Sequence, residues 1–274
     1  MTAPSLVRPN TLEYPEGLKD LEDPPNLYLV GELTSEPGVA VVGTRRCTRY
    51  GIDLADRFGR AISGAGWSVV SGLARGIDAA AHRGCLAVDG HGVAVLGSGV
   101  DVCYPNENRA LYDGILSLKG AIVSEYPPGT PPDRWRFPAR NRIIAALSVA
   151  VVVVEAARTG GALITARLAA EIGRPVFAVP GDVDRPASEG CNLLLRDGAH
   201  PVLGAGDLIE ELSLIVGPPR QPTSHTAIEL PPSGLTVDEL TSHWSLSVSD
   251  TLARIGKLEV DGLVRRSGDR VIPG

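Results

Sequence analysis

The chain has 274 residues, a formal net charge of −6, 43% hydrophobic residues and 21% charged residues. This length suits one or two domains, and the balance of residue types excludes disorder as the main state. The longest apolar run, residues 145–154, is too short to span a bilayer. Four widely spaced cysteines form no CxxC pair, so we expect neither a metal site nor a disulfide framework, and no cofactor.

The N-terminal residues predict a cytoplasmic protein with an irregular lead-in. Residues 1–10 lack the charged head and apolar segment of a secretory signal. Residues 1–38 as a whole are rich in Pro, Glu and Asp, and we expect little regular structure in them.

From residue 39 onward, short apolar runs alternate with helix-like stretches. The runs are 39–43, 67–72, 92–97, 121–125, 149–155 and 175–181, and the first helix-like stretches are 50–65 and 76–88. Runs that are apolar on both faces indicate a parallel sheet covered by helices on each side. We therefore predict an α/β fold, with a Rossmann-like, doubly wound, mostly parallel sheet over residues 39–216.

The C-terminal part predicts a linker and a small second domain. Residues 217–233 contain five prolines, which is typical of a linker. In 234–274, Thr236 can cap one helix, a second helix follows, and residues 263–272 look like a hairpin. This order predicts a winged-helix domain. Residues 236–274 carry six acidic and five basic side chains, which weighs against a transcription regulator that reads duplex DNA.

Glycine-containing polar turns follow the predicted strands. They occupy residues 43–46, 71–78, 97–99, 157–161 and 180–182. In an open parallel sheet these turns gather at the carboxyl edge, where ligands bind. Glycine permits close approach to the backbone, and the N–H groups at helix starts attract anions. One such turn indicates only tight strand–helix packing, but the set predicts a phosphate-sized anion site.

Arginines and aromatic residues are interleaved close to these turns. Arg45 and Arg46 follow the first predicted strand, and residues 133–142 read DRWRFPARNR, with Trp135 and Phe137 between arginines. A guanidinium group can contact a phosphate while an aromatic ring stacks on a base. We interpret 133–142 as a loop that binds single-stranded nucleic acid; the alternative is a core aromatic surrounded by solvated arginines.

Candidate catalytic residues are few. Asp78 and His82 share one face of a predicted helix, so an acid–base pair is conceivable. No nucleophile accompanies them at a recognisable spacing, and we favour a loop-anchoring role for Asp78 and a local hydrogen bond for His82. Glu125 and Glu155 each end a predicted strand, and we expect them to hold arginines rather than a ribose or a metal. No P-loop pattern is present, and we expect no enzyme.

Taken in order, these segments resemble the DNA-processing protein A family (DprA, also called Smf). The matching residues are 41–51, 69–82, 93–105, 122–129, 137–148, 151–181 and 190–200, and the lead-in 14–33 also fits. One departure is the TGG stretch at 159–161, where the family often has a serine. The glycine N–H groups still suit an anion.

The resemblance implies a dimeric protein that binds single-stranded DNA without cutting it and loads RecA onto it during natural transformation. Overcoming inhibition by single-strand-binding protein is also implied, which makes that protein a further expected partner. Gly43, Thr44 and Arg45 would contact phosphate, Arg134 the backbone, and Phe137 a base. The complete set of predicted DNA-site residues is Gly43, Thr44, Arg45, Arg46, Ser71, Gly72, Arg134, Phe137, Arg140, Asn141, Arg142, Gly160 and Gly161. The dimer or recombinase surface would lie near Leu208, Ile209 and Leu212.

The alternative function is a nucleotide-processing, phosphoribohydrolase-like enzyme. Such enzymes have a similar fold and also bind phosphate at strand ends. They carry a PGGxGTxxE loop with a catalytic acid, whereas ARTGGALITA, residues 157–166, has no acid at the equivalent place. We therefore favour the DNA-binding function.

Overall fold

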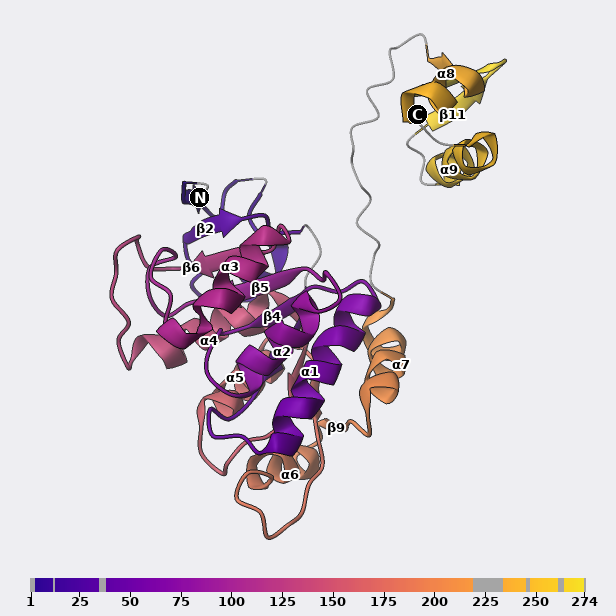
Figure 1. Ribbon diagram of the computed structural model, residues 1–274. Coiled ribbons are helices and arrows are strands. Elements are labelled where there is room, and N and C mark those ends of the chain that lie inside the picture. The colour runs from indigo at the N-terminus through magenta and orange to yellow at the C-terminus, as the bar shows by residue number, and fades with distance from the viewer. Residues whose placement is uncertain are drawn as a thin grey trace. The chain divides into compact units, whose positions relative to one another are not determined.

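The computed structural model describes residues 3–11, 13–34, 38–218, 234–244, 247–260 and 264–273. The chain forms two compact units, residues 1–221 and 222–274 (Figure 1). Most of the predicted linker 217–233 lies outside the described residues. In the described part of the chain, no helix combines the length and hydropathy of a membrane span.

The larger unit is built on one sheet, which confirms the predicted α/β fold. Its strand order is β1-β2-β6-β5-β4-β3-β7-β8-β9. Neighbours from β6 to β9 run parallel, whereas β1 and β2 are antiparallel to their neighbours. The strands are β1 (Ser5–Val7), β2 (Leu27–Gly31), β3 (Gly38–Val42), β4 (Val69–Ser71), β5 (Gly92–Val95), β6 (Ala121–Ser124), β7 (Ser148–Val153), β8 (Val176–Ala178) and β9 (His200–Pro201).

The N-terminal residues differ from the expected irregular lead-in. Strand β2 pairs with β6, β1 pairs with β2, and a 3-10 helix, η1 (Glu16–Asp20), packs against helix α4 (Arg136–Ala146). Leu18 and Leu27 are fully buried by these contacts. These elements are short and lie among prolines and acidic residues, so their stability depends on partners far along the chain rather than on a local pattern.

Helices cover both faces of the sheet. In β3, Val39 and Val41 pack in the same cluster as α1 and α7, whereas Ala40 and Val42 pack in the cluster that includes α4 and α5. This alternation on a doubly buried strand is what a parallel sheet between two helical layers requires. The remaining helices are α1 (Arg49–Gly64), α2 (Ile77–Leu86), α3 (Arg109–Ser117), α5 (Gly161–Glu171), α6 (Glu189–Arg196), α7 (Ala205–Val216) and the 3-10 helix η2 (Asn106–Asn108).

The strand order reverses beside β3. From β3 the chain adds β4, β5 and β6 in one direction, and then places β7 on the opposite side of β3. Where the order reverses, the connections after the two neighbouring strands diverge to opposite faces and leave a crevice at the carboxyl ends. The turns after β3 and β7 therefore border the position where such folds bind ligands.

The smaller unit contains two helices and an antiparallel sheet of order β10-β12-β11. Thr236 and Glu239 form a reciprocal cap at the start of α8, with N–H to oxygen distances of 2.7 and 3.3 Å. The cap and the order of two helices followed by a hairpin agree with the sequence prediction. The elements are β10 (Leu235–Thr236), α8 (Val237–Trp244), α9 (Val248–Val260), β11 (Val264–Ser267) and β12 (Arg270–Pro273).

Candidate nucleic-acid interface

A cleft of about 1180 Å³ opens at the carboxyl ends of β3 and β7. Its walls are the turn after β3 at residues 43–46, the turn after β7 at 156–160, and the first turns of α4 and α5. This is the crevice that the reversal of strand order creates, and it is large enough to take more than one nucleotide-sized group.

An aromatic pair and an arginine form one wall of the cleft. The Arg45 guanidinium lies over the Phe137 ring, 5.0 Å from its centroid. Tyr104 stacks on Phe137 with ring centroids 5.5 Å apart and an interplanar angle of 29°. Phe137 is half-buried, and Tyr104 is 45% exposed. The arrangement offers a cation and aromatic surface at one place.

Phe137 lies in a helix, so the predicted loop over residues 133–142 was wrong in part. Helix α4 begins at Arg136, which places Phe137 and Pro138 in its first turn. A proline in a first turn costs no hydrogen bond, because the N–H groups there have no partner within the helix. The proline that suggested a loop instead marks a helix start.

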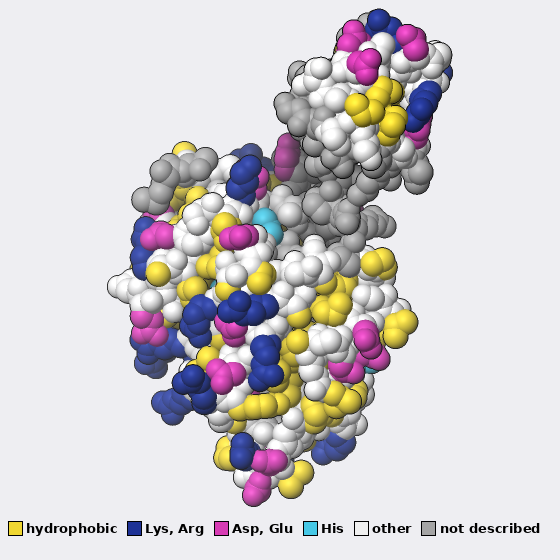
Figure 2. Space-filling model, turned by 45° about the vertical axis from the view of Figure 1, so that its right-hand side comes forward, with side chains coloured by type: hydrophobic (Ala, Val, Ile, Leu, Met, Phe, Trp, Pro, Cys, Tyr) yellow, Lys and Arg dark blue, Asp and Glu magenta, His cyan; other side chains and the backbone are white. Residues whose placement is uncertain are grey.

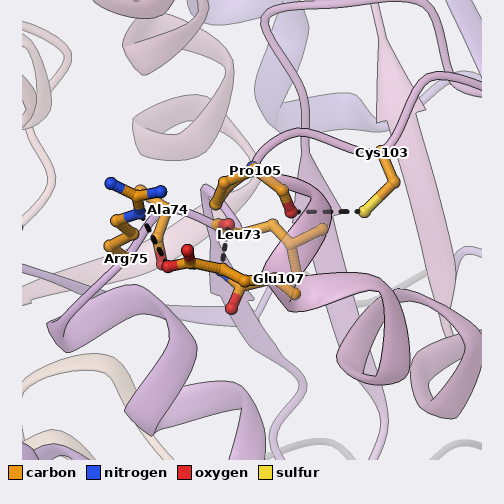
Figure 3. Close-up of polar contacts among 7 residues, drawn as sticks. Leu73, Ala74, Arg75, Cys103, Pro105 and Glu107 are labelled. Carbon is orange, nitrogen blue, oxygen red and sulfur yellow. Dashed lines mark hydrogen bonds and ion pairs between the residues drawn. The ribbon is translucent and has the colours of Figure 1, made fainter.

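The segment that carries Tyr104 is anchored to the turn after β4. The Asn108 side-chain amide donates to the carbonyl of Leu73 at 2.9 Å. The Arg75 guanidinium pairs with the Glu107 carboxylate at 2.6 Å (Figure 3). These contacts hold the Tyr104 ring beside Phe137. Sequence reasoning missed Tyr104, although an aromatic residue in a Cys-Tyr-Pro turn beyond a predicted strand was a usable signal.

The start of helix α5 lies open in the cleft. Its N-cap residue is Gly160, and no side chain among the described residues caps it. Glycines 160 and 161 are exposed, so the first N–H groups of α5 are open to a ligand. Four exposed arginines line the same cleft and have no ion-pair partner within the described ranges; they are Arg45, Arg46, Arg134 and Arg158.

The start of helix α1 is already occupied by an internal carboxylate. Glu155 accepts hydrogen bonds from the Thr48 backbone N–H at 2.8 Å and from the Thr48 hydroxyl at 2.5 Å. Its carboxylate packs against Gly51, where a Cβ atom would find no room. The expectation that Glu155 holds an arginine was therefore wrong, since a helix N-terminus attracts the carboxylate more directly. A carboxylate at this position places a negative charge at the start of α1 that the start of α5 does not have.

Arg140 forms the floor of the cleft rather than part of its open surface. It is 4% exposed and donates to the carbonyl groups of Gly72, at 2.8 Å, and Val95. Burial lowers the pKa of Arg140 to about 10. Burial also raises the pKa of Asp78, an effect that the Arg140 charge opposes. Gly72 allows the close approach, because a Cβ atom there would meet the Arg140 guanidinium.

The family model for DNA recombination-mediator protein A matches residues 5–213. The chain belongs to this family. Protein Smf of Synechocystis is 44% identical over 219 residues, which cover 77% of this chain and 55% of that protein. DNA processing protein DprA of Bacillus subtilis is 40% identical, with coverage of 73% and 68%. The chain spans about half the length of the Synechocystis and Escherichia coli Smf proteins.

Two solved structures of the family have the same fold. DprA of Streptococcus pneumoniae superimposes with a TM-score of 0.71 at 39% identity, covering 76% of this chain and 74% of that one. DprA of Helicobacter pylori gives a TM-score of 0.68 at 31% identity, covering 76% and 95%. The H. pylori work describes a single-stranded DNA binding mode for that protein.

Most of the predicted DNA-site residues of this chain meet in the cleft. The Asn141 amide also donates to the Gly161 carbonyl at 3.1 Å, which ties α4 to the start of α5. The predicted residues that line the cleft are Gly43, Thr44, Arg45, Arg46, Arg134, Phe137, Arg140, Asn141, Gly160 and Gly161.

Three predicted DNA-site residues do not line it. The Ser71 hydroxyl is buried and donates to the Val41 carbonyl at 2.7 Å. Gly72 lies beneath the Arg140 guanidinium. Arg142 pairs with Glu125 at 2.7 Å, so the expected arginine-holding role of Glu125 is confirmed.

The predicted partner surface on α7 is turned inward in this family member. Leu208 and Leu212 are fully buried in the core, and Ile209 is partly buried. Residues four apart lie on one face of a helix, and here that face packs on the sheet. The apolar residues that α7 exposes are Leu214 and Ile215.

The Asp78 and His82 pair is structural. Asp78 accepts a hydrogen bond from the Gly72 N–H at 3.1 Å, which confirms its loop-anchoring role. His82 is fully buried, and its ring nitrogens have no hydrogen-bond partner among the described residues, so the expected local hydrogen bond was wrong. Burial lowers the pKa of His82 to about 4. Its helix, α2, is buried along almost its whole length, and the charge of Arg140 also disfavours a protonated imidazole.

Proposed function

We propose that this chain binds single-stranded DNA in the cleft and delivers it to RecA as a recombination mediator. The observation that carries the proposal is the Arg45–Phe137 pair beside the open start of α5. Guanidinium and backbone N–H groups bind phosphates, and aromatic rings stack on unpaired bases. Single-stranded DNA binding by the H. pylori relative supports the same ligand for this chain.

The chemistry of the cleft favours an unpaired strand over a duplex. The bases of a duplex are stacked and paired, so they cannot reach the Phe137 and Tyr104 rings. The surface outside the cleft gives a duplex little general attraction: the net charge is −6, and Figure 2 shows basic and acidic side chains interspersed over the visible face of the larger unit. Stacking reads little sequence, so we expect binding to be sequence-tolerant.

The proposed role is binding without bond chemistry. Asp78, which lines the cleft, is buried and accepts the Gly72 N–H, and Glu155, at the end of β7, accepts hydrogen bonds from Thr48, so both acids already have structural roles. Incubation with nucleoside monophosphates tests the phosphoribohydrolase alternative directly. Release of free base would support that alternative. A RecA-loading role also places the protein in the cytoplasm, with a homodimer as the expected assembly.

Two substitutions test the DNA site by separate physical effects. Arg45→Ala removes one phosphate contact, so affinity for oligothymidylate should fall and the salt slope should decrease by about one charge. Phe137→Ala removes a stacking surface and should cost roughly 1–3 kcal/mol with an unchanged salt slope. The measurement is fluorescence anisotropy at several salt concentrations, with duplex DNA as competitor.

The matched control is Arg60→Ala, which removes an arginine of α1 that pairs with Asp56 at 2.7 Å and does not line the cleft. Equal affinity for DNA in Arg45→Ala, Phe137→Ala and the wild type would overturn the proposed site.

The proposed delivery of DNA to RecA requires a separate measurement. On a strand coated with single-strand-binding protein, the wild type should shorten the lag before RecA hydrolyses ATP, and Arg45→Ala should shorten it less. Normal DNA binding with an unchanged lag would reject the loading role while leaving the DNA site intact.

A further inference from the structure

A second group of arginine and aromatic side chains lies outside the cleft. The Arg136 guanidinium is 5.1 Å from the centroid of the Trp135 ring and 4.9 Å from that of Tyr126. The two rings meet edge to face, with centroids 6.0 Å apart. The cluster joins the start of α4 to the segment after β6, and Trp135 and Tyr126 do not line the cleft.

Trp135 is held in one orientation but is not buried. Its indole N–H donates to the Asp133 carboxylate at 2.9 Å, and its side chain is 58% exposed. Arg136 is itself tied to the Pro131 carbonyl. A large aromatic surface in water is unfavourable, so these contacts fix the ring without giving it the benefit of burial. A rigid, exposed ring loses little conformational entropy when a flat ligand stacks on it.

The position of Trp135 relates this cluster to the cleft. Phe137 follows Trp135 by two residues, and side chains two apart on a helix do not share a face. Phe137 points into the cleft, whereas Trp135 lies outside it. Arg134, the residue before Trp135, lines the cleft and is exposed. Trp135 is thus the next residue in the chain after one that lines the cleft, and its ring would be available to a polynucleotide that left the cleft past Arg134.

We propose that Trp135, braced by Tyr126 and Arg136, is a second base-stacking subsite for the same single strand. Its ligand is an unpaired base of any sequence, and Arg134 contacts the phosphate backbone between the two subsites. The charges around the ring suit this ligand, because Arg134 and Arg136 flank it and the nearby Asp133 and Glu125 carboxylates are engaged by the indole N–H and by Arg142. The subsite rests on the proposed function of the cleft.

The native fluorescence of the chain provides a direct readout. Its tryptophans are Trp67, Trp135 and Trp244, and Trp67 is buried. In the full chain with Trp67→Phe and Trp244→Phe, Trp135 is the sole indole emitter. Long oligothymidylate should quench this emission, because stacking on a base quenches indole fluorescence, and an oligonucleotide short enough to fill only the cleft should quench it much less.

Affinity measurements supply the second readout. Trp135→Leu should weaken binding of the long oligonucleotide roughly 5- to 160-fold, with an unchanged salt slope. The short oligonucleotide should bind as it does to the wild type. Trp135→Phe keeps an aromatic face and should retain most of the affinity, which separates stacking from a general effect on folding.

The outcomes separate this subsite from the cleft. If the wild type binds neither oligonucleotide, the proposed function itself fails. If the wild type binds both, Phe137→Ala weakens both, Trp135→Leu leaves binding unchanged, and the long oligonucleotide does not quench Trp135 emission in the chain with Trp67→Phe and Trp244→Phe, only the second subsite is overturned. Equal weakening of both oligonucleotides by Trp135→Leu would also overturn a separate subsite outside the cleft.

Discussion

Phe137 and its two neighbours decide what the cleft can bind. The sequence allowed two interpretations, a core aromatic or a base-stacking ring. The ring is half-buried, Arg45 lies over it, and Tyr104 stacks beside it. A core aromatic would be covered by apolar side chains, whereas these neighbours are a cation and an exposed tyrosine. These neighbours therefore favour a ring that stacks on a base.

Tyr104 should extend the stack and contribute to binding. Tyr104→Ala removes an exposed face next to Phe137, and we expect single-stranded DNA affinity to fall by about 1 kcal/mol or more. Tyr104→Phe keeps the ring and should bind as the wild type does. Anisotropy titrations with oligothymidylate measure both variants. Tighter binding by Tyr104→Ala would contradict this and would mean that Tyr104 covers the Phe137 face that DNA needs.

Two helices supply most of the interface, and their contact sets its geometry. Helix α4 carries Phe137 toward the cleft, and its Asn141 amide holds the first carbonyl of α5. Helix α5 contributes open N–H groups, while the start of α1 has the Glu155 carboxylate bound to its N-cap residue, Thr48. Both helices follow glycine-containing turns, so this difference between their starts comes from how the elements pack together.

A negative charge at the start of α5 should lower DNA affinity without lowering thermal stability. Gly161→Asp places a carboxylate where a phosphate would bind, and the only neighbour that its Cβ meets among the described residues is the Asn141 amide, 3.7 Å away. A carboxylate there favours the helix, so thermal stability should hold or rise. DNA affinity should fall by at least 1 kcal/mol through repulsion.

Gly161→Asn is the matched control, because it has the same shape without the charge and should bind DNA more tightly than Gly161→Asp. Equal DNA affinity in the two variants would show that α5 does not bind a phosphate.

Helix α2 is buried along almost its whole length inside the larger unit. Helix α2 packs between α1, α3 and the sheet, and it encloses His82 with Arg140 nearby. The imidazole has to stay neutral in the folded protein. The stability of the larger unit therefore depends on pH through a histidine that does not line the cleft.

The buried, neutral His82 predicts that the free energy of unfolding falls as the pH decreases. The pKa of His82 is lowered from 6.5 to about 4 by burial. Between these values the unfolded chain binds a proton that the folded chain does not, so stability is full above pH 6.5 and falls as pH decreases toward 4. His82 should account for about 3 kcal/mol of that loss.

Urea unfolding at several pH values, compared between the wild type and His82→Leu, isolates this contribution from that of the carboxylates. The pH dependence between 6.5 and 4 should be shallower in His82→Leu. The same pH dependence of the free energy of unfolding in the two proteins would contradict this role of His82.

Local sequence was sufficient for the framework of the fold. The apolar runs identified β3 to β8, because a strand buried on both faces must be apolar at successive positions. The glycine turns and arginines located the edge where the cleft opens, since parallel strands bring their carboxyl ends together. Ten of the predicted DNA-site residues line that cleft for this reason.

Only the tertiary structure decided which of those residues face the cleft. Arg140 and Arg142 are both arginines of one motif, yet one is buried against the carbonyl groups of Gly72 and Val95 and the other pairs with Glu125. Tyr104 reaches Phe137, and Leu208 turns to the core, through contacts between segments far apart in the chain. Residue type and spacing determine the chemistry that a segment can offer. The burial of a side chain and the groups that it contacts depend on packing between distant segments, so the tertiary structure alone decides them.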